Sequence, residues 1–444
     1  MVLMSDAASA SRHFAESVVR TLRKAGHQAV FAGGCVRDLL LGQPAKDYDV
    51  ATDARPAEIR NLFGKGRTLA VGESFGVVVV IPSRADRKRG IPSVEVATFR
   101  TDGDYRDGRH PENVVFATPE QDARRRDFTI NGMFLDPSDD RVLDFVGGLD
   151  DLRERKIRAI GDPRARMRED KLRLLRAIRF TATLDFDLDP DTSAAVREMA
   201  GDLVIVSAER ITQELRRMLV DPSRARAVEL CHGHGLLEVI IPELAPVWDT
   251  TKKRNAELWP TTLRRLSELI NPSFEVAMAA LLAVLISPSL AGVDSASPLD
   301  GVGARMRFSN AESDRIAWLL GHFGHLDDFP HMTLAQAKRL AAHQGAAELL
   351  TLEQARVASL DRDRGAVAAF ADFLIKTSSA AINPAPLLSG ADLIKLGLKP
   401  GPCFGTLLEA VRDAQLNEQI SNRDEALALV RELQNRPNAG TPMR

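Results

Sequence analysis

The chain has few cysteines and few aromatic residues for its length. Only three of its 444 residues are cysteine, namely Cys35, Cys231 and Cys403, and none of them forms a CxxC pair. This pattern argues against a disulfide framework and a cysteine zinc site, and it predicts a reducing, cytoplasmic location. Aromatic residues make up 5% of the chain, against 44% hydrophobic and 27% charged residues. That composition is typical of a globular protein, and the length suggests about three domains.

Long hydrophobic runs, a secretory signal and a P-loop are also missing. The longest uninterrupted apolar run, Val276 to Ile286, has 11 residues, about half of the roughly 20 that cross a bilayer. We therefore expect a buried helix there and no membrane partner. The N-terminus has no basic region followed by a hydrophobic core. The absence of a GxxxxGK[ST] motif sets aside the P-loop route to phosphate binding.

Charge of one sign does not dominate the whole chain, but it does dominate one segment. The formal net charge is −2, which by itself predicts no partner. From Asp151 to Phe180, however, 11 Lys and Arg residues stand against 5 Asp and Glu residues, a local balance of +6. We expect a polyanion to dock on this segment.

Hydrophobic periodicity changes along the chain from the β type to the helical type. Five short segments rich in Val, Ile and Phe are strand candidates: residues 28–32, 48–51, 76–81, 93–99 and 114–117. From Asp170 onward, apolar residues recur at spacings of three and four, as in Leu172, Leu175 and Ile178. We therefore predict an α+β protein, with a mixed sheet domain first and helical domains after it.

The segment from Phe31 to Gly42 has the pattern of a strand, a tight turn and a helix. Gly33 and Gly34 allow the backbone to approach a ligand closely. The first N–H groups of the following helix, with Arg37 nearby, are suited to an anion such as a triphosphate. A pair of glycines alone is usually structural, so this interpretation needs support from a second motif nearby in the chain.

Asp47 and Asp49 flank Tyr48 at the expected start of the next strand. Residues i and i+2 of a strand project from the same face, so both carboxylates point one way. Like charges held close together resist joint ionisation unless a cation lies between them, and two converging carboxylates suit Mg²⁺. The sequence therefore predicts a magnesium site at this pair of acids.

These motifs form part of a long ordered series that resembles one family. The stretches GGCVRDLLLGQPAKDYDVATDA, RRRDFTINGMFLDP and REDKLRLLRAIRFTATLDF are similar to successive motifs of the class II tRNA nucleotidyltransferases and bacterial poly(A) polymerases. Within this family the chain most resembles bacterial CCA-adding enzymes. The resemblance implies a nucleotidyltransferase head of the polymerase β type with a mixed sheet, followed by an all-helical neck, body and tail. We expect these parts at residues 1–144, 145–215, 216–376 and 377–444.

The resemblance also assigns roles to residues. It implies that Asp47 and Asp49 hold two catalytic metal ions, Mg²⁺ or Mn²⁺, and Glu95 is a candidate third carboxylate. Gly34 and Arg37 are expected near the incoming triphosphate, where two metal ions would stabilise the attacking and leaving oxygens. The remaining expected nucleotide contacts lie in the second motif and in the helix expected from Arg168 onward: Arg126, Asp127, Asp170, Arg173, Arg176 and Arg179. Asp127 is expected at the ribose hydroxyls, whereas Thr129 and Asn131 are expected to brace the turn.

The resemblance implies that Asp170 and Arg173 pair with the incoming base, and base chemistry agrees with that role. In one continuous helix, Arg173 and Arg176 fall opposite Leu174, Leu175 and Ile178. Cytosine and adenine each present an amino donor beside a ring-nitrogen acceptor, which an acceptor Asp beside a donor Arg complements. Uracil and guanine present the reverse order and leave polar groups unpaired, at about 1–3 kcal/mol each.

We therefore expect an enzyme that adds or repairs the 3′-terminal CCA of tRNA from CTP and ATP. The loop from Arg100 to His110 resembles the element associated with switching from CTP to ATP, and Asp392 to Gln415 resembles a tRNA-holding region. A poly(A) polymerase or an enzyme adding only A or only CC remains an alternative, and a catalytically silent RNA-binding factor is a remote one. The expected partners are tRNA, CTP and ATP, and no required protein partner is evident.

Overall fold

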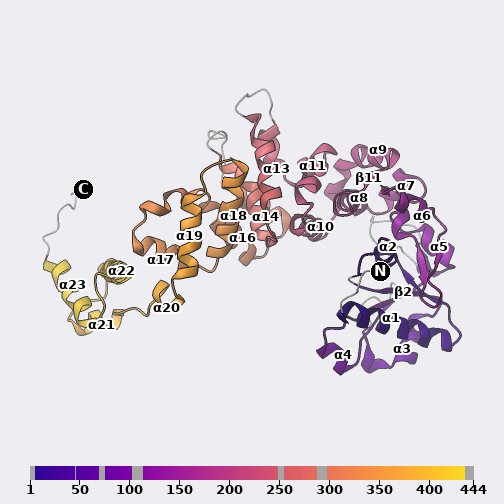
Figure 1. Cartoon of the computed structure of the whole chain (residues 1–444), viewed down its shortest axis with the longest axis horizontal. Helices are drawn as coiled ribbons and strands as arrows, with labels where there is room; N and C mark the ends of the chain where they lie inside the picture. The colour runs from indigo at the N-terminus through magenta and orange to yellow at the C-terminus, as the bar shows by residue number, and fades with distance from the viewer. Residues whose placement is uncertain are drawn as a thin grey trace. The chain divides into compact units, whose positions relative to one another are not determined.

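The chain divides into two compact units, residues 1–242 and 243–444, whose elements are labelled in Figure 1. The computed structural model describes residues 6–45, 47–69, 76–102, 114–248, 255–287 and 298–435. Most of the loop from Arg100 to His110 therefore lies outside the described residues. The domain limits expected near 144, 215 and 376 do not coincide with the limit between the two units, and they stay predictions.

The first unit opens with a mixed seven-stranded sheet in the order β3-β4-β5-β2-β1-β8-β9. β2 and β5 are parallel, and the other neighbours are antiparallel. The strands are β1 (Ala29–Ala32), β2 (Asp49–Thr52), β3 (Thr68–Leu69), β4 (Val77–Val80), β5 (Val94–Thr98), β8 (Phe134–Asp136) and β9 (Arg141–Leu143). Four of the five predicted strands are β1, β2, β4 and β5. The fifth is β7 (Val114–Phe116), which pairs instead with β6 (Arg100–Asp102).

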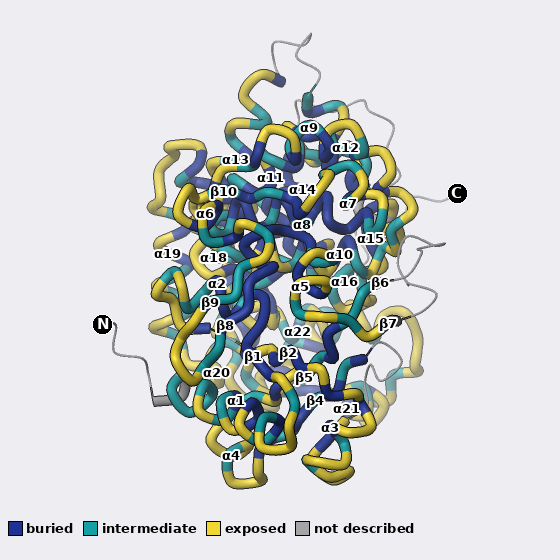
Figure 2. The backbone as a smooth tube through the Cα atoms, turned by 90° about the vertical axis from the view of Figure 1, so that its right-hand side faces the viewer, coloured by how far each residue is buried: buried dark blue, intermediate teal, exposed yellow. Residues whose placement is uncertain are grey.

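The central strands β1 and β2 are almost fully buried, whereas β4 and β5 alternate between buried and more exposed side chains. Figure 2 shows β1 and β2 in buried colours, with exposed segments in α3 and α4. In β5, Val94 and Val96 are buried while Glu95 between them is exposed. Phe99 and Phe134 meet edge to face at 5.8 Å in the core of the head. This packing fixes the register of the strands and hence the face on which their polar residues emerge.

Helices surround the sheet and continue after it in the first unit. They are α1 (Asp6–Lys24), α2 (Gly34–Leu40), α3 (Pro56–Phe63), α4 (Arg84–Lys88), α5 (Pro119–Arg124), α6 (Gly148–Arg153), α7 (Pro163–Glu169), α8 (Leu172–Thr183), α9 (Pro190–Glu198), α10 (Ala208–Val220), α11 (Arg224–Gly233) and α12 (Leu236–Ile240), with the short 3₁₀ turns η1 (Lys65–Arg67) and η3 (Thr129–Asn131). The expectation that everything after residue 145 is helical is wrong in one detail. β10 (Lys156–Ile157) and β11 (Asp187–Leu188) form a small parallel pair.

The expected helix through Asp170 is also corrected. α7 ends at Glu169, and Asp170 is extended, with φ −146° and ψ 107°, before α8 begins at Leu172. The residues from Arg168 to Lys171 are all charged, so apolar periodicity could not locate this break. Within α8 the predicted apolar face is correct, because Leu174, Leu175 and Ile178 are fully buried. The opposite face does not meet open solvent, since Arg173 is also buried.

The second unit is helical throughout its described residues. Its helices are α13 (Leu258–Glu268), α14 (Phe274–Leu282), α15 (Pro298–Met306), α16 (Asn310–Gly321), α17 (Leu334–Ala342), α18 (Ala346–Ser359), α19 (Gly365–Lys376), α20 (Ser379–Ile382), α21 (Gly390–Lys395), α22 (Cys403–Leu416) and α23 (Arg423–Asn435). The long apolar run forms α14 and the 3₁₀ turn η7 (Ala283–Ile286), and most of it is buried. No helix within the described ranges is long and apolar enough to cross a membrane.

Candidate active site

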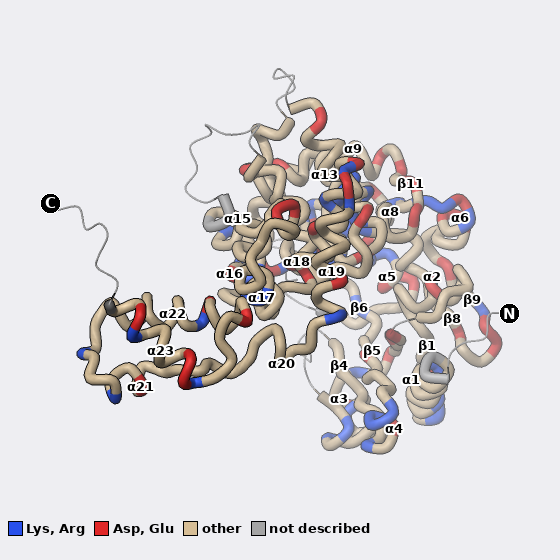
Figure 3. Tube along the Cα trace, turned by 60° about the vertical axis from the view of Figure 1, so that its left-hand side comes forward, with Lys and Arg blue, Asp and Glu red and all other residues tan. Residues whose placement is uncertain are grey.

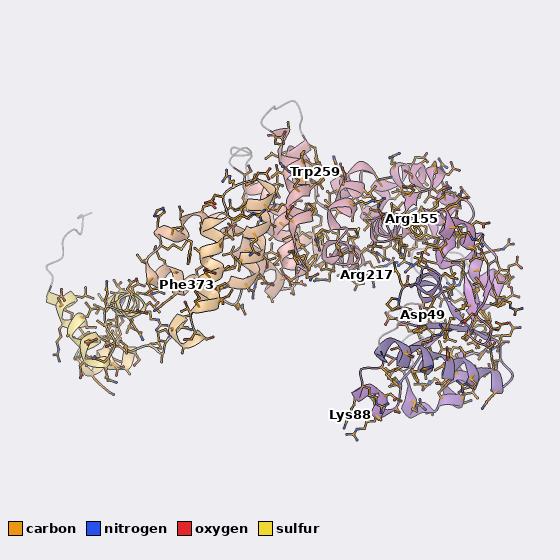
Figure 4. All side chains as sticks on the ribbon, in the orientation of Figure 1. Asp49, Lys88, Arg155, Arg217, Trp259 and Phe373 are labelled. Atoms are coloured by element: carbon orange, nitrogen blue, oxygen red, sulfur yellow. The ribbon has the colours of Figure 1, made fainter. Side chains whose placement is uncertain are left out.

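A cavity of about 1070 Å³ lies in the first unit, between the sheet domain and helices α8 and α10. Every predicted site residue except Glu95 lines it: Gly34, Arg37, Asp47, Asp49, Arg126, Asp127, Asp170, Arg173, Arg176 and Arg179. Asp49 and Arg217, which are labelled in Figure 4, belong to its two walls. The structure thus brings together residues that are more than 100 positions apart in the sequence.

The two acids of the DxD motif share one face, as predicted. β2 begins at Asp49, and Asp47 lies in the bend that precedes it. Tyr48 between them is buried and packs against Phe31 with ring centroids 5.2 Å apart, so the neighbouring carboxylates emerge on the opposite side. Neither carboxylate has a hydrogen-bond or ion-pair partner among the described residues.

Asp49 is the acid whose protonation this environment changes most. The cavity opens onto its side chain, so water reaches it, yet protein surrounds it on most sides. This burial, together with the charges of Glu95 and Asp47, raises the pKa of Asp49 to about 6, although Arg126 opposes the shift. Glu95 lies directly opposite Asp49 on the parallel strand β5. A carboxylate held under such repulsion favours binding a cation.

A glycine turn brings an arginine close to this pair of acids. Gly33 has φ +71°, and a Cβ placed on it would lie 2.9 Å from Nη1 of Arg126. Arg126 donates to Oδ2 of Asp122 at 3.0 and 3.2 Å, and its ring contact is Phe134. The Arg125 and Arg126 guanidinium groups hold the pKa of Asp122 below its usual value despite burial, which alone would raise it. The positive φ of Gly33, which other residues rarely adopt, is the reason that glycine suits this turn.

Arg37 on α2 is held by two partners beside the same turn. Its guanidinium donates to Asp38 Oδ1 at 2.6 and 2.8 Å and to Asn131 Oδ1 at 2.8 Å. The side chain of Asn131 also donates to Asp127 at 3.2 Å, while Thr129 donates to Asp151 at 2.7 Å. Asn131 and Thr129 thus connect this turn to neighbouring elements, in keeping with the bracing role predicted for them.

Asp127 is fully engaged with the protein. One carboxylate oxygen accepts from Nε and Nη2 of Arg176 at 2.9 and 2.5 Å, and the other accepts from the Phe128 N–H and from Asn131. Burial alone would raise its pKa, but Arg176 and these hydrogen bonds hold the pKa at about 2. The predicted contact with ribose hydroxyls therefore has to share this carboxylate with an arginine.

The expected base-reading pair is also held in place by other side chains. Asp170 accepts from both terminal nitrogens of Arg210 at 3.1 and 2.7 Å and from the Leu172 N–H at 3.0 Å. Arg173 donates to Glu169 at 2.6 Å and to two backbone carbonyls. Both residues line the cavity, so their positions are set before a nucleotide arrives.

The ring of Phe180 lies under three of the arginine side chains. The guanidinium carbons of Arg37, Arg176 and Arg179 lie 5.3, 5.2 and 4.1 Å from the ring centroid of Phe180. Glu214 on α10 pairs with Arg179 at 2.6 Å. Contacts with a ring face and a buried acid restrict the arginines to defined positions.

Sequence reasoning missed several residues that build this site. Asp122, Phe180, Arg210 and Glu214 are the main ones, and their partners lie mostly on other elements. The only sequence signal was the i,i+4 spacing of Arg210 and Glu214, which places them on one face of α10. It indicates a polar face but does not say which residues that face meets.

Replacing Asp127 with alanine is expected to lower the free energy of unfolding by about 2–3 kcal/mol. Removing one partner of a buried ion pair costs about 3–5 kcal/mol, and the loss is smaller here because Arg176 keeps Glu214 at 3.8 Å. This loss of unfolding free energy is present at neutral pH. It disappears as the pH falls toward 2, because the pKa of Asp127 is depressed in the folded protein. Urea unfolding measures it. Asp150→Ala, which breaks an exposed pair with Arg153, is the control and should cost under about 0.5 kcal/mol; equal losses would contradict this account.

Two family models and several characterised proteins match this chain. Residues 29–158 match the family model described as "Poly A polymerase head domain", and residues 185–247 match "Probable RNA and SrmB- binding site of polymerase A". A CCA-adding enzyme of Lactobacillus helveticus is 30% identical over 419 residues, 92% of this chain and 94% of the relative. One from Geobacillus thermodenitrificans is 41% identical over 244 residues, 55% of this chain. That match spans only 58% of this second relative.

Solved structures of CCA-adding enzymes are also similar to this chain. The Bacillus stearothermophilus CCA-adding enzyme in complex with CTP is 29% identical, with a TM-score of 0.75 over 98% of this chain and 99% of the other. The Thermotoga maritima CCA-adding enzyme complexed with tRNA_CCA has a TM-score of 0.60 over 98% of this chain and all of the other. At 20% identity, this second likeness concerns the fold alone.

Proposed function

Because the chain belongs to the family of CCA-adding enzymes, which are nucleotidyltransferases, we propose that it adds or repairs the 3′-terminal CCA of tRNA from CTP and ATP. The RNA 3′-hydroxyl attacks the α-phosphorus, and pyrophosphate leaves. The observation that carries the proposal is the cavity that joins the unpartnered Asp47–Asp49 pair to Asp170 and Arg173. A cytoplasmic location belongs to the same proposal and is supported by the sparse cysteines.

The carboxylates of Asp47 and Asp49 are suited to binding divalent cations. This family typically depends on a divalent metal, and hard cations prefer carboxylate oxygens. Asp47 and Asp49 are both directed into the cavity without hydrogen-bond or ion-pair partners among the described residues, and Asp49 lies opposite Glu95 on β5. These two residues would hold two Mg²⁺ or Mn²⁺ ions, and Glu95 lies within their electrostatic range. When bound, the ions stabilise charge on the attacking and leaving oxygens.

The walls of the cavity would position the triphosphate. Gly33 and Gly34 keep side chains away from the path of the ligand, and Arg37 and Arg126 carry positive charge to it. Each guanidinium is already fixed by an acid, Asp38 or Asp122. Fixed cations need no reorganisation during the reaction and so favour its transition state.

Asp170 and Arg173 would select the base. The carboxylate of Asp170 has lone pairs beyond those that Arg210 and Leu172 use, so it can still accept from an amino group. Arg176 and Arg179 lie beside this pair on α8 and form the wall next to it. Arg210 then acts as a positioning residue that fixes the acceptor for cytosine and adenine.

Incorporation assays with single nucleotides test the proposal against its alternatives. The substrates are tRNAs that end at the discriminator base, at C74 or at C75, and each receives one nucleoside triphosphate at a time. With CTP we expect two C residues to be added to the first tRNA and one C to the second, and with ATP one A to be added to the third, with extension ending there. Repeated A addition would instead identify a poly(A) polymerase, and absence of incorporation would leave an RNA-binding factor.

A further inference from the structure

Six exposed basic residues lie next to β3, one of the two edge strands of the head sheet. They are Lys65 and Arg67 in η1, Arg84, Arg87 and Lys88 in α4, and Arg89 directly after α4. We call them the basic edge. Figure 3 shows blue segments around α3 and α4, and Figure 4 labels Lys88 at the extremity of the head. None of the six has an ion-pair partner among the described residues.

Strand topology places the basic edge at the same end of the sheet as the acid pair. Asp49 at the start of β2 pairs with Glu95 near the start of β5. β4 is antiparallel to β5 and ends at Val80, which in turn pairs with Thr68 at the start of β3. η1 directly precedes β3, and α4 follows β4 after three residues. From β2 through β5 and β4 to β3 there are three spacings between neighbouring strands, about 14 Å in all.

The charge of the basic edge is not neutralised within its own segment. Asp86 is the acid of α4, and it is engaged in starting that helix. Its carboxylate accepts from the hydroxyl of Ser83, while its backbone N–H donates to the same hydroxyl. On the preceding helix, Glu58 accepts from the backbone N–H of Arg55. The basic side chains therefore keep their charge for a ligand.

We propose that the basic edge binds the phosphate backbone of the substrate RNA near the 3′ end that reaches Asp47 and Asp49. This inference rests on the proposed function, because that RNA must enter the end of the sheet where the acids lie. One strand of a duplex carries a phosphate about every 3.4 Å of axis, so the roughly 14 Å between the strand of Asp49 and the strand beside the basic edge corresponds to about four phosphates. Contacts with phosphates are independent of base sequence, as an enzyme acting on many tRNAs requires.

The test removes two of these cations. Arg84→Gln together with Lys88→Gln neutralises residues four apart on α4. The matched control is Arg20→Gln with Lys24→Gln, two exposed cations on α1. Since α1 leads into the start of β1, they lie toward the opposite end of the sheet. Binding of tRNA lacking CCA is measured without nucleotides between about 50 and 200 mM salt, and the KM for tRNA is measured at saturating CTP.

The edge variant is expected to bind tRNA about 10- to 100-fold more weakly at low salt, with a log–log salt slope smaller by about 2. Its KM for tRNA rises while kcat at saturating tRNA is unchanged, and the control variant matches the wild type. An unchanged slope and KM in an active edge variant overturn this inference alone. If the edge variant loses binding to anionic phosphatidylserine vesicles but binds tRNA as the wild type does, the basic edge binds a membrane surface and the inference is wrong. If the wild type incorporates no nucleotide, the proposed function fails first.

Discussion

Asp49→Asn is expected to lower nucleotide incorporation at least about 10³-fold, because metal-ion stabilisation of charge contributes several kcal/mol to the barrier. The same change should stabilise the metal-free protein near neutral pH. Burial and neighbouring acids raise the pKa of Asp49 to about 6, so its ionisation opposes folding increasingly as the pH rises from about 4 to about 6. Asparagine removes that opposition.

Thermal unfolding in EDTA separates these two effects. The Asp49→Asn variant should have a higher Tm than the wild type at about pH 7.5 and the same Tm at about pH 4. Added Mg²⁺ should raise the Tm of the wild type but not that of the Asp49→Asn variant. Asp53→Asn, at the other end of β2, is the control, since its amide oxygen can still accept from the Gln28 N–H. Full incorporation by Asp49→Asn would refute the role assigned to this acid.

Asp170→Ala is expected to relax the choice of base. Loss of the fixed acceptor removes the pairing with cytosine and adenine and the mismatch with uracil and guanine, each about 1–3 kcal/mol. The ratio of kcat/KM for CTP over UTP should therefore fall about 10- to 100-fold, while the dependence on Mg²⁺ stays as in the wild type. The measurement is single-nucleotide kinetics on tRNA lacking CCA.

A matched variant separates base selection from general disturbance. Asp191→Ala removes an exposed acid from the first turn of α9 and should leave all the ratios unchanged. If Asp170→Ala lowers incorporation of all four nucleotides equally, Asp170 is a structural residue and not part of the base-reading pair.

Local patterns were sufficient to predict the fold class and much of the sheet. Short segments rich in Val and bounded by Gly or Pro predicted β4 and β5, where every second side chain is buried. β8 and β9 were not predicted because their sequences, FLD and RVL, have only two apolar residues each, whereas β7, which has the same length, has the fully apolar sequence VVF. The break at Asp170 was missed because the residues from Arg168 to Lys171 are all charged, so apolar periodicity gives no information about where α7 ends and α8 begins.

Much of the site could also be predicted, but not the contacts that hold it. The motifs indicated which residues line the cavity, and all of them except Glu95 do so. Their partners remained hidden, as with Asp170 and Arg210, which are 40 positions apart, or Asp127 and Arg176, 49 apart. Such pairs depend on tertiary packing, for which a single sequence has no periodic signal.

Binding of Mn²⁺ tests the central claim most directly, namely that the acids at the start of β2 hold the divalent ions. Electron paramagnetic resonance of free Mn²⁺ counts the ions bound to the wild type and to a variant carrying both Asp47→Asn and Asp49→Asn, each without nucleotide, since CTP would itself bind Mn²⁺. We expect the wild type to bind Mn²⁺, and we expect the variant, still folded by circular dichroism, to lose this binding together with incorporation. Equal Mn²⁺ binding by the two proteins would contradict it.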